Sequence, residues 1–117
     1  MHGEARIVAL GPHDGVALAD PVEGEVTFKA RGLESGGALC VSERELAPGA
    51  AVPSHVHDGQ EEALYVLAGQ LRVRLGERTY PCAAGGFLLI PRGTPHAIEN
   101  ACDAPARVLA VLAPASA

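Results

Sequence analysis

Residues 49–69 read GAAVPSHVHDGQEEALYVLAG, and residues 85–100 read GGFLLIPRGTPHAIEN. Both stretches consist of short apolar runs that end at glycine, proline or asparagine, which is typical of brief strands separated by tight turns. In the first stretch Gly69 lies between two alternating segments, and glycine supplies the positive φ that a hairpin turn needs. In the second stretch Pro91 has no amide hydrogen, so it ends the strand before it.

The same pattern continues on both sides of these stretches. Alternating segments are found at 4–10, 25–30, 38–46, 70–75, 78–81 and 107–113, and helical periodicity is not sustained over ten residues anywhere. The expected fold is therefore all-β, an antiparallel jelly-roll barrel. A chain of 117 residues fits one domain. We expect residues 38–113 to form the barrel core and residues 1–37 to form N-terminal strands or an arm.

Composition excludes several classes of partner. The net charge is -5 and charged residues are 20% of the chain, so neither nucleic acid nor an anionic membrane is an expected partner. The longest apolar runs, such as 108–113, are too short to span a bilayer, and the opening residues lack a leader pattern, which predicts a cytoplasmic protein. Three cysteines without a CxxC pair predict reduced, mostly buried thiols.

A cluster of metal-binding residue types follows the first alternating segment. His55 and His57 are separated by one residue, so on a strand both imidazoles face the same side. Such a pair alone indicates a solvated strand end. A carboxylate, Glu61 or Glu62, follows a turn that can aim it at the pair, and strand parity cannot decide between the two because the turn resets it.

Both stretches resemble the cupin superfamily, whose motifs are G(X)5HXH(X)3-4E(X)6G and G(X)5PXG(X)2H(X)3N. The matching positions are Gly49, His55, His57, Glu62 and Gly69 in the first motif and Gly85, Pro91, Gly93, His96 and Asn100 in the second. The spacer, residues 70–84, is similar to that of small single-domain microbial cupins. The resemblance selects Glu62 over Glu61, adds His96 to the candidate ligands, and implies a structural role for Asn100.

The resemblance implies one divalent transition-metal ion bound by His55, His57, Glu62 and His96. Three imidazoles and one carboxylate suit Fe, Mn, Ni, Cu, Co or Zn, whereas Ca and Mg prefer oxygen ligands. Four protein ligands leave one or two positions open on an ion that accepts five or six, as in catalytic sites. The alternative is a structural metal ion that only stabilises a small barrel.

Arg44 is a further candidate residue. If Leu46 points into the barrel, Arg44 does too, and its guanidinium could hold a substrate carboxylate or enolate or pair with a buried acid. A surface arginine at a strand end is the simpler interpretation. Cys40 is expected to be a small buried hydrophobe and Tyr65 to lie on the outer face. His2 and His13, outside both motifs, are expected to be exposed.

The leading functional hypothesis is a metal-dependent enzyme that acts on a small organic molecule, a dioxygenase similar to quercetinase-like cupins. Two alternatives stay open: a redox-neutral Lewis-acid isomerase, cyclase or decarboxylase, and a non-catalytic module that binds a sugar or an acidic metabolite. We also expect a homodimer, because the strands of residues 1–37 lack an obvious partner within a small barrel.

Overall fold

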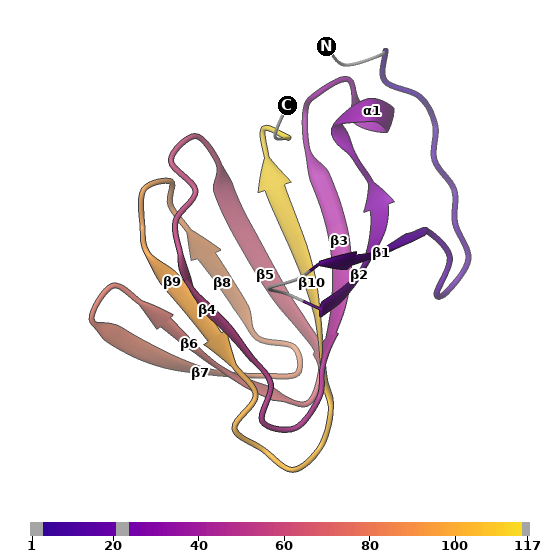
Figure 1. Ribbon diagram of the computed structural model, residues 1–117. Helices are drawn as coiled ribbons and strands as arrows, with labels where there is room; N and C mark the ends of the chain where they lie inside the picture. Colours follow the sequence, from indigo (N-terminus) through magenta and orange to yellow (C-terminus); the bar gives the residue numbers. More distant parts are fainter. Residues whose placement is uncertain (1–3, 21–23, 116–117) are drawn as a thin grey trace.

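The computed structural model describes residues 4–20 and 24–115, and these residues form ten strands and one short helix (Figure 1). The elements are β1 (Val16–Asp20), β2 (Gly24–Ala30), α1 (Gly32–Ser35), β3 (Cys40–Leu46), β4 (Ala51–His55), β5 (Glu61–Ala68), β6 (Gln70–Leu75), β7 (Arg78–Ala83), β8 (Phe87–Ile90), β9 (His96–Glu99) and β10 (Ala106–Ala113).

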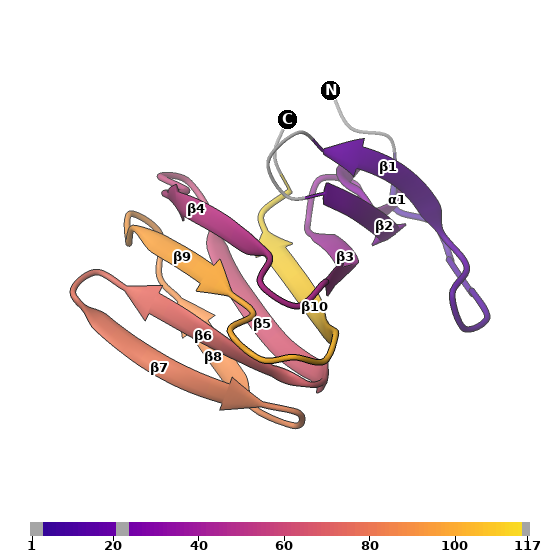
Figure 2. The same cartoon turned by 60° about the horizontal axis from the view of Figure 1, so that its bottom comes forward.

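The strands build two antiparallel sheets that face each other as two layers (Figure 2). One sheet has six strands in the order β1-β2-β3-β10-β5-β8, and the other has four in the order β4-β9-β6-β7. Every pairing between neighbouring strands is antiparallel. The expected all-β jelly-roll is confirmed.

Aliphatic side chains from both sheets fill the space between the layers. Burial alternates along β5, where Glu62, Leu64 and Val66 are buried, and along β10, where Ala106, Val108 and Ala110 are buried. Val73 and Ile98 face them from the smaller sheet. This period of two is the signature of strands with one face on a core.

Gly69 forms the hairpin turn between β5 and β6 that the sequence predicts. Its φ is +77°, and a Cβ at this position would lie 2.6 Å from the carbonyl oxygen of Pro105. Both the backbone conformation and the close approach of a neighbouring chain segment therefore require glycine here.

In the N-terminal part, residues 4–10 do not form the strand that their alternation suggests, and Ile7 is 96% exposed. β1 forms this edge of the larger sheet. β2 pairs with β3 of the same chain, with Val26 opposite Arg44. The premise that these strands lack a partner in the barrel is therefore wrong for β2.

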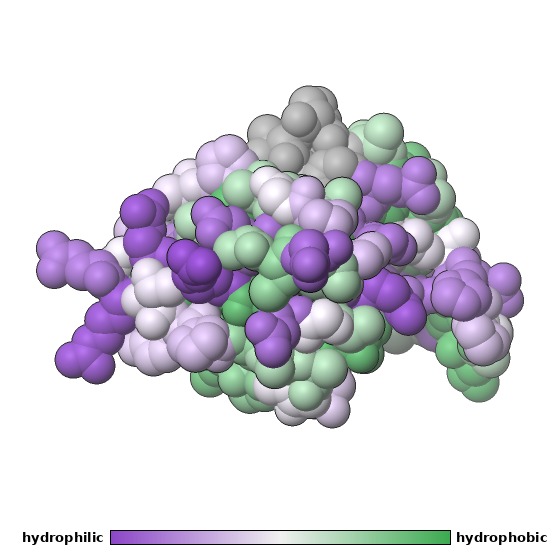
Figure 3. Space-filling view, turned by 90° about the horizontal axis from the view of Figure 1, so that it is seen from below, coloured by the Kyte–Doolittle hydropathy of each residue, from purple (hydrophilic) through white to green (hydrophobic). Residues whose placement is uncertain are grey.

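No helix among the described residues is long and apolar enough to cross a membrane. All three cysteines are free thiols. Cys82 is buried, Cys40 is half-buried and Cys102 is exposed, so the expectation that most of the thiols are buried is wrong. The end of the molecule that carries the loops 47–50 and 100–105 shows intermixed hydrophilic and hydrophobic residues (Figure 3).

Candidate metal centre

Four candidate ligands come from three strands and one loop. His55 is the last residue of β4, His57 lies in the following loop, Glu62 is the second residue of β5, and His96 is the first of β9. β4 and β9 belong to the smaller sheet and β5 to the larger, so the cluster joins the two layers. A backbone hydrogen bond of 2.9 Å from Gly93 N–H to the carbonyl of His57 ties the two loops beside it.

The side chains of these four residues converge. One potential ligand atom from each residue lies within 4.8 Å of the others. The ring centroid of His55 is 5.1 Å from that of His57 and 4.2 Å from that of His96. Mutual distances of this size allow one ion to contact all four groups, since metal–ligand bonds of about 2.0–2.2 Å place ligand atoms roughly 3–4 Å apart.

Two of the imidazoles are oriented by backbone carbonyls. His55 Nδ1 lies 2.9 Å from the carbonyl oxygen of Pro53, and His96 Nδ1 lies 2.9 Å from that of Thr94. Because a carbonyl oxygen only accepts, each Nδ1 carries the proton and donates it. In the neutral form of each ring, Nε2 then presents a lone pair, which is the arrangement that metal-binding histidines use.

Glu62 and His96 are the most deeply buried members, with 2% and 1% of their side chains exposed. Burial opposes charge on Glu62, but contact with His96 and the charge of Arg44 outweigh it and hold the pKa of Glu62 below its usual range. Burial likewise opposes charge on His96, whereas Glu62 and the Thr94 carbonyl raise its pKa. The pair therefore favours a carboxylate beside an imidazolium in the metal-free protein.

The donor set fits a transition-metal ion. His96 Nε2 and Glu62 Oε1 are 3.0 Å apart, yet neither these two atoms nor Glu62 Oε2 forms a well-directed hydrogen bond within the part of the chain that the structure describes. Buried polar atoms without such bonds are costly unless another group satisfies them. A cation with nitrogen and oxygen preference would satisfy all three atoms at once.

Glu61 has a different role from its neighbour. Its carboxylate faces away from the cluster and accepts hydrogen bonds of 2.5 and 2.6 Å from the guanidinium of Arg92. This contact lowers the pKa of Glu61 to about 2. Glu61 is the first residue of β5, and Arg92 lies in the loop between β8 and β9. Their ion pair therefore connects the start of β5 to the loop before His96. Sequence reasoning did not single out Arg92, because an arginine between two motif positions carries no pattern of its own.

Arg44 points into the barrel, so its interpretation as a surface residue is wrong. Its side chain is 5% exposed, and its Nη2 lies 3.7 Å from Oε2 of Glu62. The inward direction follows from the alternation along β3, where Ser42 and Leu46 are also buried. A guanidinium therefore stands beside the candidate ligands.

The remaining candidates lie outside the cluster. Tyr65 is exposed on the outer face of β5, as expected. Cys40 is only half-buried. His13 is exposed as expected, and His2 lies outside the described residues.

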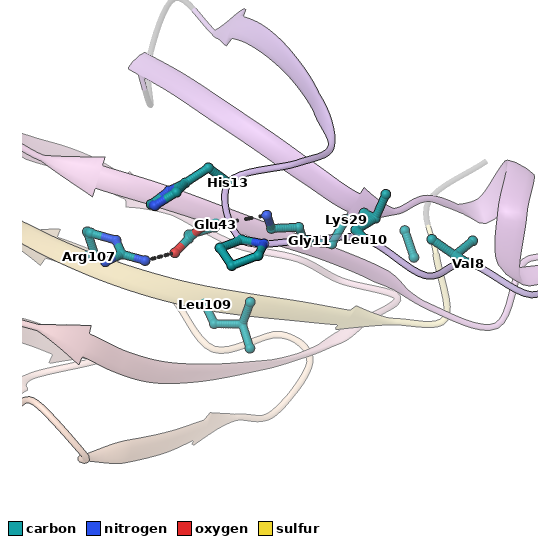
Figure 4. A pocket seen from close by; sticks show the side chains of 10 residues that line it. Val8, Leu10, Gly11, His13, Lys29, Glu43, Arg107 and Leu109 are labelled. Atoms are coloured by element: carbon teal, nitrogen blue, oxygen red, sulfur yellow. Dashed lines mark hydrogen bonds and ion pairs between the residues drawn. The ribbon is translucent and has the colours of Figure 1, made fainter.

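A surface hollow of about 810 Å³ is lined by none of the four candidate ligands (Figure 4). It lies between the segment of residues 8–13 and the outer surface of β2, β3 and β10. Its charged groups are already engaged: Arg107 pairs with Glu43, and Lys29 donates to the carbonyl of Asp14. It offers no group of converging ligands, so size alone does not make it the candidate site.

Comparisons with known proteins point to one family. The family model described as Cupin domain matches residues 42–112. The tetracenomycin polyketide synthase protein TcmJ of Streptomyces glaucescens is 37% identical over 70 residues, covering 60% of this chain and 47% of that protein. An oxalate-binding protein of Thermotoga maritima is 32% identical over 68 residues, covering 58% and 56%.

A solved structure supports the fold. The crystal structure of an RmlC-like cupin from Shewanella frigidimarina aligns with a TM-score of 0.78 at 15% identity, covering 95% of this chain and 93% of that one. At this identity the likeness concerns the fold alone. The matched part of the chain spans about half the length of the two curated relatives, 47% of TcmJ and 56% of the oxalate-binding protein.

Proposed function

The chain belongs to the cupin domain family, whose model matches residues 42–112, and from this premise we propose that it is a metal-dependent enzyme for a small organic substrate. His55, His57, Glu62 and His96 would hold one divalent transition-metal ion. The observation that carries the proposal is the convergence of four ligand atoms within 4.8 Å, together with buried side-chain atoms of Glu62 and His96 that form no well-directed hydrogen bond.

The asymmetry of burial supports a catalytic rather than a purely structural ion. Glu62 and His96 are buried, whereas His55 and His57 are half-exposed. An ion held by the four side chains would therefore keep one side toward the solvent, where a substrate can reach it. A structural site, in contrast, is normally closed by its protein ligands.

We propose a dioxygenase as the leading reaction class. A bound iron, manganese, nickel or copper ion would supply redox chemistry with dioxygen. The protein residues would orient the ligand atoms, through the carbonyls of Pro53 and Thr94, and exclude bulk water with the aliphatic side chains between the sheets. Glu62 would keep its negative charge at neutral pH, because its pKa lies below the usual range.

A redox-neutral Lewis-acid enzyme is the second candidate, and the buried Arg44 favours it. A guanidinium 3.7 Å from Glu62 could stabilise negative charge that develops on a substrate oxygen beside the ion. The similarity to a polyketide synthase protein and to an oxalate-binding protein fits substrates rich in oxygen. A non-catalytic binding module would share the site but turn over nothing.

Metal identity and oxygen uptake separate these candidates. Protein purified without an affinity tag is analysed for bound metals, and oxygen consumption is then measured with hydroxylated and carboxylated small molecules. We expect a redox-active ion and oxygen uptake that His57→Ala abolishes, with His13→Ala as the matched control because His13 lies outside the cluster. Bound zinc with product formation but no oxygen uptake would favour the Lewis-acid enzyme.

We further propose a homodimer. Phe87, Leu89 and Tyr65 are exposed on the outer face of the larger sheet, where Tyr65 pairs with Phe87 across β5 and β8. Leu109 of β10 lies opposite Tyr65 on the other side. A continuous apolar face of this kind is typical of surfaces that associate. We propose that a second copy of this chain covers this face. The proposed dimer therefore rests on the apolar outer face and not on unpaired strands in residues 1–37.

A further inference from the structure

The loop between β8 and β9, residues 91–95, lies beside the loop between β4 and β5 at the same end of the barrel (Figure 1). It begins with a turn in which the Thr94 N–H donates to the Pro91 carbonyl at 3.3 Å. Gly93 occupies the third position of this turn with a φ of +80°, a conformation that favours glycine. The turn therefore gives residues 92–94 a defined backbone course just before His96.

Two backbone groups of this loop contact candidate ligands. The Gly93 N–H donates to the carbonyl of His57 at 2.9 Å. The Thr94 carbonyl accepts a hydrogen bond from Nδ1 of His96 at 2.9 Å, which sets the orientation of that ring. One short loop thus restrains a ligand from each of the two neighbouring segments.

Arg92 adds a third contact through its side chain. Its Nε and Nη2 donate to the two carboxylate oxygens of Glu61 at 2.5 and 2.6 Å, and its backbone N–H donates to the same carboxylate at 3.3 Å. A guanidinium that binds both oxygens fixes the direction of the contact as well as its distance. Glu61 directly precedes the candidate ligand Glu62 on β5, so Arg92 restrains β5 at the point where this ligand begins.

The exposure of this ion pair shows where its effect lies. The side chains of Arg92 and Glu61 are 53% and 40% exposed. Exposed ion pairs normally contribute little to the stability of a fold. This pair, however, connects two segments that carry candidate ligands, so we expect its effect on the geometry of the site to exceed its effect on the fold.

We propose that Arg92 is a positioning residue of the metal centre, because its ion pair with Glu61 holds the start of β5 against the loop between β8 and β9. The candidate ligands on both segments then keep the mutual distances that one ion needs. This inference rests on the proposed function, since its effect is on metal binding. Ligands that are held in place before the ion arrives bind it more tightly, because less conformational freedom is lost on binding.

The charge of Arg92 by itself would have the opposite effect. Removing a positive charge from a loop beside the site would make a cation bind more tightly. Loss of the positioning contact would make the cation bind more weakly. The direction of the change in metal affinity therefore distinguishes positioning from charge.

The test uses the whole 117-residue chain, stripped of metal with a chelator. The Kd for zinc is measured by competition with a chromophoric chelator for the wild type, for Arg92→Gln and for the double variant Arg92→Gln with Glu61→Gln. The double variant removes the ion pair without changing the net charge and leaves neither partner unpaired, in case the single variant folds poorly. Arg72→Gln is the matched control, because the ion pair of Arg72 with Glu99 on the smaller sheet is similarly exposed, at 58% and 51%.

Two further measurements separate the site from the fold. The Tm of each metal-free protein reports whether the fold is weakened. The visible absorption of the cobalt-loaded protein reports the geometry of the ligands around the ion. A residue that only supported the fold would lower the metal-free Tm and leave the cobalt absorption of the folded protein unchanged.

We expect the zinc Kd to rise about tenfold in Arg92→Gln and in the double variant, which is the lower end of the cost of removing a residue that orients a metal ligand. The cobalt absorption should change in both, while the metal-free Tm and all values for Arg72→Gln should match the wild type. An unchanged or lower zinc Kd in Arg92→Gln, or an equal rise in Arg72→Gln, would overturn the inference and leave the metal site intact. A wild type that binds neither zinc nor cobalt would overturn the proposed function and this inference with it.

Discussion

Glu62 of β5 and His96 of β9 face each other across the two sheets, with Oε1 of the carboxylate 3.0 Å from Nε2 of the imidazole. Each sheet supplies one partner, so the contact exists only when the two layers are packed together. Because both atoms are buried, any ion that binds between them stabilises the packed state over the unfolded chain. Metal binding and folding are therefore coupled at this contact.

This coupling predicts opposite pH dependences for the metal-free and metal-loaded protein. In the metal-free protein the pKa of Glu62 lies below its ordinary 4.5 and that of His96 above its ordinary 6.5. The charged form of Glu62 stabilises the fold above about pH 4.5, and this stabilisation is lost as the pH falls through the lowered pKa. The charged form of His96 stabilises the fold below about pH 6.5, and this stabilisation is lost as the pH rises through the raised pKa. The joint contribution of the pair to the free energy of unfolding should be largest between these two pH values.

In the metal-loaded protein the histidines must be neutral, so protons compete with the ion below about pH 6.5. We expect the rise in Tm that the metal causes to shrink between about pH 7 and pH 5. Two melting series, with and without chelator, measure this difference. A difference in Tm that stays constant over that range would show that these histidines do not hold the ion.

The ion pair of Glu61 and Arg92 predicts a measurable pKa. The Glu61 carboxyl should titrate at about 2 in the folded protein, and NMR detection of its side-chain carbon would follow this titration. Arg92→Gln should return the pKa toward its ordinary range, because the guanidinium that stabilises the charged form is gone. Arg78→Gln is the control, since Arg78 is exposed on β7. A Glu61 pKa near 4.5 in the wild type would contradict the ion pair between Glu61 and Arg92.

Asn100 predicts a large loss of stability on substitution. Its side chain is fully buried, donates to the carbonyls of Leu46 and Ala104 at 3.0 and 2.9 Å, and accepts from the backbone N–H of Cys102 at 3.1 Å. Asn100→Ala leaves these groups without their partner and should lower the free energy of unfolding by about 2–3 kcal/mol in urea denaturation. The exposed neighbour Glu99→Ala should cost less than about 1 kcal/mol. Equal losses would contradict the structural role.

The apolar outer face predicts a dimer that one charge can break. Light scattering at micromolar concentration should give about twice the chain mass of 12.0 kDa. Phe87→Glu places a charge on this face and should yield the monomer, whereas Tyr80→Glu on the smaller sheet should leave the dimer intact. A monomeric wild type would refute the proposal.

The two motifs predict the fold and the candidate ligands because their glycines, proline and histidines each carry a local geometric meaning. Gly69 needs a positive φ, and Pro91 follows the end of β8, whichever neighbours surround them. The placement of residues 4–10 could not be predicted in this way, because their alternation is equally compatible with a strand and with a segment that lies outside the sheet.

Arg44 shows a second limit of the sequence. Its inward direction follows from the alternation along β3, but a charged residue at such a position normally indicates a solvated face. The contact with Glu62 from across β10 offsets part of the cost of burying the guanidinium. Arg92 likewise gains its role from Glu61, which is 31 residues away in the chain. Partners distant in sequence decide both cases.

The metal content of protein purified without an affinity tag tests the proposed metal centre directly. Inductively coupled plasma mass spectrometry of the wild type, of His57→Ala and of His13→Ala compares a cluster histidine with an exposed one. We predict about one transition-metal ion per chain in the wild type and in His13→Ala, and a large loss in His57→Ala. Full metal content in His57→Ala, or none in the wild type after reconstitution with Zn, Ni, Mn and Fe, would contradict metal binding by this cluster.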